Sequence, residues 1–113
     1  MAKRRAESAT ITRGSTNVFE DLGYPDAAER QAKLRLAYAL NQVLEHRGLT
    51  QTAAATLLGL SQPKVSALKN YKLAGFSVER LMTFLNALGQ DVEIVIKNKP
   101  RSRQAARITV VAA

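Results

Sequence analysis

The chain has 113 residues, with 17 lysines and arginines against 9 acidic residues, a formal net charge of +8 and a pI near 10.3. It has no cysteine, which excludes disulfides, thiolate zinc sites and a cysteine nucleophile. It has one histidine, which makes a catalytic triad improbable. No apolar run approaches the roughly 18 residues of a membrane span, and no apolar signal core follows the basic N-terminus. We therefore expect one small cytoplasmic domain with no enzymatic activity, no metal and no cofactor.

The positive charge is concentrated at the two ends of the chain. Residues 1–14 carry four basic side chains and one acidic one, and residues 97–113 carry five basic side chains and no acidic one. Between them, residues 57–75 contain three lysines and no carboxylate. This distribution favours a polyanion as partner, because each neutralised phosphate releases condensed counterions. The alternative is that the charge serves solubility alone.

The first part of the chain predicts an arm, a short helical turn and a long helix. Residues 1–16 lack an apolar period and are expected to form a flexible basic arm, and Asn17 can cap a short turn over 17–22. A helix is expected from Pro25 to Arg47, before Gly48. One face of this helix carries apolar residues at helical spacing, namely Leu36, Leu40, Val43 and Leu44.

Three shorter helices are predicted next, each preceded by a hydroxyl residue that can cap its N-terminus. They are expected over Gln51–Leu58 after Thr50, from Gln62 to about Asn70 after Ser61, and over Val78–Leu88 after Ser77. Gly59 and Gly89 follow the first and the last of them.

After Gly89 the period changes, and the segment from Asp91 to Ile96 predicts a β-strand. One strand on a small helical domain exposes an edge that needs a partner. Two such strands could pair across a two-fold axis, with Val92, Ile94 and Ile96 and the last helix at the dimer interface. The competing arrangement is an internal hairpin with a weaker strand candidate at 107–111, so residues 98–113 form either a basic tail or a second strand.

The stretch from Gln51 to Asn70 has the pattern of two helices joined by a tight turn. Ala55 is a small residue for the helix contact, and Gly59 tolerates a left-handed backbone in the turn. Four apolar residues would bury the inner faces, namely Leu58, Leu60, Val65 and Leu68. The outer face of the second helix is then polar or small throughout, with Gln62, Lys64, Ser66, Ala67 and Lys69. Such a face suits entry of the helix N-terminus into the major groove.

These residues resemble a known family. Gln51, Ala55, Gly59, Val65 and Leu68 stand at the spacing of the helix-turn-helix in the lambda-repressor/Cro-like (Xre) family. Longer phrases at 17–23, 62–68, 75–81 and 85–94 resemble the Xre-type antitoxins and regulators encoded beside HigB/RelE-type toxins. The resemblance covers roughly residues 16–97 and implies a mainly α, lambda-repressor-like domain of four to five helices with a C-terminal strand. It also implies a homodimeric repressor on a palindromic operator, usually its own promoter, with a HigB/RelE-type toxin as partner.

The resemblance also implies roles for single residues. Gln62 is the foremost base-reading candidate, since a Gln amide can pair bidentately with adenine. Lys64 and Ser66 could reach base edges or phosphates, and Ala67 offers a methyl contact to thymine. Phosphate contacts are implied for Gln51, Ser61, Lys69, Asn70 and Lys72. Pro63 and Ala67 depart from residues common in the family, which leaves the operator sequence open.

Two other functions compete with the antitoxin. One is an Xre-type regulator without a toxin, and the reading frame beside the gene would distinguish it. The other is a helical module that binds only proteins. A DNA-binding protein should lose affinity steeply as salt rises, whereas a protein-binding module need not.

Overall fold

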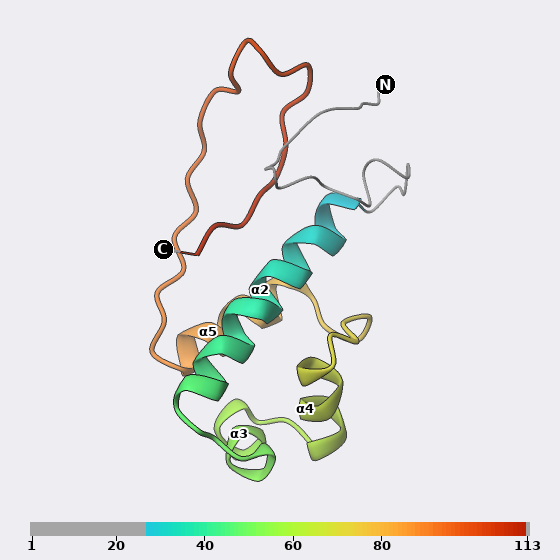
Figure 1. The fold of residues 1–113 in the computed structure, drawn as a ribbon, viewed down its shortest axis with the longest axis vertical. Coiled ribbons are helices and arrows are strands. Elements are labelled where there is room, and N and C mark those ends of the chain that lie inside the picture. The colour runs from blue at the N-terminus through green and yellow to red at the C-terminus, as the bar shows by residue number, and fades with distance from the viewer. Residues whose placement is uncertain (1–26, 113) are drawn as a thin grey trace. The chain divides into compact units, whose positions relative to one another are not determined.

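The computed structural model describes residues 27–112, so the expected arm at 1–16 and the helical turn at 17–22 lie outside the described residues. Four helices follow in order: α2 (Ala27–His46), α3 (Gln51–Leu58), α4 (Gln62–Lys69) and α5 (Val78–Ala87) (Figure 1). The mainly helical fold class is therefore confirmed. None of these helices is long and apolar enough to cross a membrane, and residues 27–112 contain no group of three potential metal ligands.

Helix α2 enters the helical unit at Lys33, and this unit contains Lys33–Glu93. Leu36, Leu40 and Leu44 of its predicted apolar face are almost completely buried, whereas Val43 is half-buried. Gly48 takes a left-handed φ of +64°, and the backbone nitrogen of Leu49 donates to the carbonyl of Leu44 at 3.1 Å. The glycine thus ends the helix where the sequence predicted.

Helices α3 and α4 form the predicted pair around a tight turn. Thr50 Oγ1 accepts a hydrogen bond from the Ala53 nitrogen at 3.1 Å, and Ser61 Oγ accepts one from the Lys64 nitrogen at 3.4 Å. These caps satisfy backbone donors that the first helical turn leaves without a partner. Helix α3 packs against both α4 and α5.

The turn between α3 and α4 depends on Gly59, whose φ is +69°. No atom lies within 4 Å of a Cβ built on this glycine, so backbone strain is the main cost of a larger residue. We expect Gly59→Ala to lower the free energy of unfolding by about 1–2 kcal/mol, measured by urea denaturation. Gly59→Asn is the matched control and should lose less, since asparagine visits this conformation more readily. Equal stability of Gly59→Ala and the wild type would contradict this assignment.

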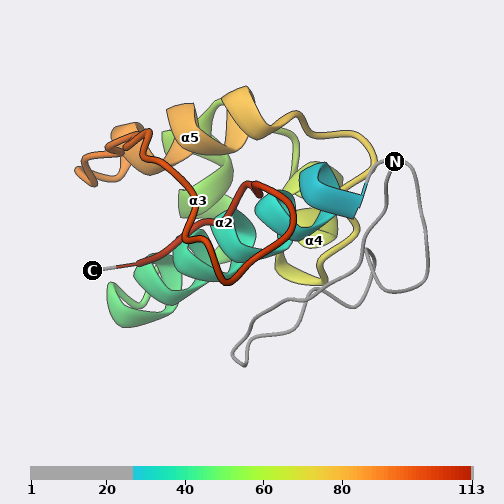
Figure 2. The same cartoon turned by 90° about the horizontal axis from the view of Figure 1, so that it is seen from above.

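Helix α5 completes the core of the helical unit. Ser77 caps it by accepting from the Arg80 nitrogen at 3.0 Å, while Phe76 and Phe84 pack edge to face with ring centres 6.0 Å apart. A guanidinium nitrogen of Arg47, just after α2, donates to the carbonyl of Leu88 at the end of α5. This bond supplies a partner for a carbonyl that the helix end leaves open. Figures 1 and 2 both show α5 to the left of α4, with α2 running diagonally through the unit.

The chain after Gly89 differs from the sequence-based expectation. No residue from 90 to 112 is in a strand, so the predicted strands at 91–96 and 107–111 are not confirmed. Among the described residues, the second unit contains Ala27–Ala32 and Ile94–Val110. The chain from Ile94 runs out in an extended form, turns where the Arg103 nitrogen donates to the Pro100 carbonyl at 3.2 Å, and runs back (Figure 1). A strand requires a ladder of hydrogen bonds to a neighbouring segment, and residues 90–112 form no such ladder.

Candidate nucleic-acid interface

The outer face of α4 is the candidate interface. Val65 and Leu68 are completely buried, which turns the polar residues between them away from the core. Gln62, Lys64 and Lys69 are exposed, and Ser66 and Ala67 are partly exposed. We call these five residues the α4 outer face. The structure therefore presents to solvent all the side chains that the sequence predicted for contact with bases.

Gln62 begins α4 and is oriented by a residue of α3. Its Nε2 donates to Thr52 Oγ1, 3.4 Å away, and both side chains are exposed. An amide nitrogen has two hydrogens and the amide oxygen accepts separately, so the group keeps one donor and its acceptor for a base. Sequence reasoning missed Thr52, because only the packing of α3 on α4 brings positions 52 and 62 together.

Lys64 lies against the loop that follows α4. Its Nζ is 5.3 Å from the ring centre of Phe76, and a Cβ built on Gly75 would come within 2.9 Å of the same nitrogen. The missing side chain of Gly75 therefore leaves room for the ammonium. A contact to a base edge would cost Lys64 this cation–π interaction, worth about 0.5–1 kcal/mol at an exposed site. Gln62 thus remains ahead of Lys64 as the base-reading candidate.

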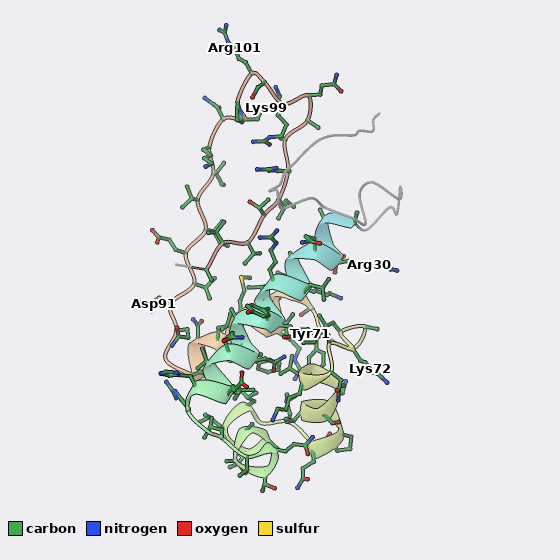
Figure 3. All side chains as sticks on the ribbon, viewed as in Figure 1. Arg30, Tyr71, Lys72, Asp91, Lys99 and Arg101 are labelled. Atoms are coloured by element: carbon green, nitrogen blue, oxygen red, sulfur yellow. The ribbon has the colours of Figure 1, made fainter. Side chains whose placement is uncertain are left out.

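The C-terminal end of α4 gathers the candidate phosphate contacts. Asn70 Nδ2 donates to the Ser66 carbonyl at 2.9 Å and keeps a second hydrogen for another acceptor. Lys69, Asn70 and Lys72 are all exposed, and Figure 3 shows Lys72 projecting outward. Residues 57–75 contain no carboxylate to neutralise the lysines. This end of the helix can therefore attract phosphates.

Tyr71 holds this end of the helix in an unusual conformation. Its φ is +60°, a left-handed value that a bulky side chain rarely adopts. The Lys72 nitrogen donates to the Ala67 carbonyl at 2.8 Å, and the Tyr71 nitrogen donates to the Leu68 carbonyl at 3.2 Å. These two bonds form the helix-ending pattern that glycine usually supports. Sequence reasoning missed this helix end, since tyrosine at this position does not suggest a left-handed residue.

Two further candidate phosphate residues lie at helix starts. Gln51 is the first residue of α3 and is half-buried. The oxygen of Ser61 is occupied as the cap of α4, while its hydroxyl hydrogen stays available as a donor.

Asn41 of α2 forms a hydrogen bond with the backbone of α4 on the side that faces the core. Its Nδ2 donates to the Leu68 carbonyl at 3.2 Å, in a partly buried setting. This bond joins residues 27 positions apart and ties the last turn of α4 to the long helix. Sequence reasoning missed Asn41 as well, because a polar residue on a long helix does not reveal which neighbour it meets.

The candidate dimer residues belong to the segment after α5. Val92 is half-buried, whereas Ile94 and Ile96 are exposed, at 73% and 93%. Together with Val95, they form a run of three exposed apolar side chains.

Comparison with known proteins agrees with this geometry. A family described as a helix-turn-helix domain matches residues 18–97. A solved structure named as an XRE family transcriptional regulator is 75% identical to the chain, with a TM-score of 0.75, and the match covers 79% of this chain and all of the other. None of the curated proteins compared matches the chain. The chain therefore belongs to the Xre family of helix-turn-helix transcriptional regulators.

Proposed function

We propose that this protein is a sequence-specific DNA-binding repressor that binds a palindromic operator as a homodimer. The observation that carries the proposal is the α4 outer face, which is exposed, polar or small, and free of carboxylates. A helix end of this kind fits the major groove of B-DNA. We assign DNA binding to a domain of residues 17–97, which basic segments 1–16 and 98–113 flank in the sequence. We place the protein in the cytoplasm.

We assign the α4 outer face two kinds of contact. Gln62 reads a base, with Lys64, Ser66 and Ala67 as secondary base contacts. Phosphates are bound by Lys69 of this face and by the residues around it, namely Gln51, Ser61, Asn70 and Lys72. Exposure supports most of these roles, and the capping bond of Ser61 leaves its hydrogen available. Phosphate contacts fix the position of the protein on the duplex, and base contacts select the sequence.

Thr52→Val tests how Gln62 is oriented. Valine keeps the shape of threonine and removes the hydroxyl that accepts from Gln62 Nε2. We expect a weaker preference at the base pair read by Gln62, by up to the roughly 1–3 kcal/mol of a good bidentate contact, with overall affinity changed less. Affinities for operators mutated at each position measure this. Thr56→Val, on the next turn of α3, is the control, and identical base preferences in Thr52→Val and Thr56→Val would rule out the role of Thr52.

We propose that the dimer forms through Val92, Ile94 and Ile96, with α5 beside them. The exposure of Ile94 and Ile96 supports this, because two extended segments pairing across a two-fold axis would cover them. A two-fold dimer also sets two copies of α4 against successive turns of one DNA face, as a palindromic operator requires.

Selection from a pool of random duplexes tests the repressor proposal. We expect enrichment of an inverted repeat whose half-sites are about one helical turn apart. Affinity for it, measured by fluorescence anisotropy, should fall steeply with salt because several phosphates are contacted. A pool without any enriched sequence would contradict the proposal and favour the protein-binding module.

We also propose that the protein is the antitoxin of a type II toxin–antitoxin module that represses its own operon. The resemblance of residues 17–23, 62–68, 75–81 and 85–94 to Xre-type antitoxins supports this. Co-expression with the product of the neighbouring reading frame tests it. A HigB/RelE-type product that arrests growth alone, and that co-purifies with this protein and is neutralised by it, is the expected result. A neighbour with neither property would leave an Xre-type regulator without a toxin.

A further inference from the structure

The segment after α5 contains two apolar extended stretches joined by a closed turn. We call residues 92–96 the first limb and residues 107–111 the second limb. Ile94, Val95 and Ile96 of the first limb are 73%, 71% and 93% exposed, and Ile108 and Val111 of the second are 63% and 82% exposed. The connecting turn is basic, and Figure 3 shows Lys99 and Arg101 at its tip.

Both faces of the first limb are uncovered. Side chains alternate along an extended chain, so Ile94 and Ile96 lie on one face and Val95 on the other. Pairing of two first limbs across a dimer would give a sheet of only two strands, which by itself is marginal in water, whereas additional strands stabilise a sheet. Such a dimer would also leave Ile108 and Val111 of each copy exposed.

We infer that the second limb of each copy adds to the first limb of the other copy. The two first limbs then lie at the centre of a four-stranded sheet, and each is flanked by the second limb of its partner. This inference rests on the dimer proposed above and names a second copy of this chain as the occupant of the limbs.

The conformation of the single chain favours exchange over an internal hairpin. The turn between the limbs is already closed by the hydrogen bond from the Arg103 nitrogen to the Pro100 carbonyl, and the second limb runs back in the opposite direction (Figure 1). A hairpin closed in this way should continue into a ladder, yet no residue from 90 to 112 is in a strand. In the exchanged sheet a partner strand lies between the two limbs of one chain. A strand ladder between the two limbs of one chain is then not expected.

The apolar surface of the limbs matches what a dimer requires. Burial of a valine or isoleucine side chain contributes about 1.5–3 kcal/mol, which corresponds to roughly 60–120 Å² of apolar area. The five exposed side chains of each copy would together bury on the order of 600–1,200 Å² in the dimer. The upper end of this estimate meets the lower end of the roughly 1,200–2,000 Å² of stable complexes.

Engineered disulfides distinguish exchange from a hairpin, because the chain has no cysteine of its own. Adjacent strands are about 4.8 Å apart, and a disulfide requires Cα atoms within about 7 Å. The limbs of one chain would be two strand spacings apart in the exchanged sheet, too far for this bond. We would mix Glu93→Cys protein with differently tagged Thr109→Cys protein, and separately oxidise the double variant.

Exchange predicts a mixed disulfide between the two tagged chains and covalent dimers of the double variant. The matched control replaces Thr109→Cys by Gln104→Cys, outside the limbs, and should give at least ten-fold less mixed product. Ile108→Asp should weaken the dimer at least ten-fold by light scattering, whereas Gln104→Asp should not change it, and circular dichroism confirms the helical fold of both. If the protein is a dimer but the double variant forms only a disulfide within one chain, the exchange is wrong and the proposed dimer still stands. A monomeric wild type would overturn both the exchange and the proposed dimer.

Discussion

Ile94→Asp is expected to give a monomer with a folded helical unit and operator affinity lower by about 100-fold or more. Ile94 is 73% exposed and lies outside the core of α2–α5, so the charge does not disturb helix packing. In the dimer the same carboxylate would be buried without a partner, which the interface cannot accommodate. Each monomer then binds a half-site independently. It lacks the high effective concentration by which one bound subunit of a dimer promotes binding of the other.

Light scattering and anisotropy on the same operator measure this effect. Gln104→Asp, in the segment between the limbs, adds the same charge and should remain dimeric with nearly unchanged affinity. An Ile94→Asp protein that stays dimeric would show that the interface lies elsewhere.

The pair of substitutions Lys69→Gln and Lys72→Gln is expected to weaken operator binding tens- to hundreds-fold at low salt without changing the preferred sequence. Both lysines are exposed beside the end of α4, where no carboxylate within residues 57–75 neutralises them. A dimer would lose four phosphate contacts, so the slope of log affinity against log salt should become shallower by about 3 to 4.

Titration over a range of salt concentrations measures the slope, and a panel of operator variants measures the preference. His46→Gln, at the exposed end of α2, is a control for the introduction of glutamine. An unchanged salt slope would remove Lys69 and Lys72 from the phosphate contacts. A changed sequence preference would instead assign them to base reading.

The helices could be predicted from the sequence because their signals are local. Thr50, Ser61 and Ser77 each accept the capping hydrogen bond that their positions suggested. Gly48 and Gly59 take the left-handed conformations expected at helix ends. The periodicity of α2 likewise identified Leu36, Leu40 and Leu44 as buried, because helical spacing decides which side chains share a face.

The contacts that orient the site could not be predicted in this way. The bonds from Gln62 to Thr52 and from Asn41 to Leu68 join residues on different helices, and the sequence does not state the angle at which those helices pack. Lys64 shows the same limit, since its position over Phe76 depends on the path of the loop and on Gly75. Local patterns therefore located the site but not the orientation of its side chains.

The segment after Gly89 shows where a local pattern is insufficient. The β-branched residues of 91–96 favour an extended backbone, and the chain there is extended without forming a strand. Extension is a property of one chain, whereas a strand requires hydrogen bonds to a neighbour. The second copy inferred above would supply that neighbour.

Footprinting of the wild type and of Gln62→Ala on the DNA upstream of the gene's own reading frame decides whether α4 reads bases. We expect two protected half-sites about one helical turn apart, with the variant tolerating other base pairs at one symmetric position in each half-site. Absence of any protected site, or a variant as selective as the wild type at every position, would contradict base reading by the α4 outer face.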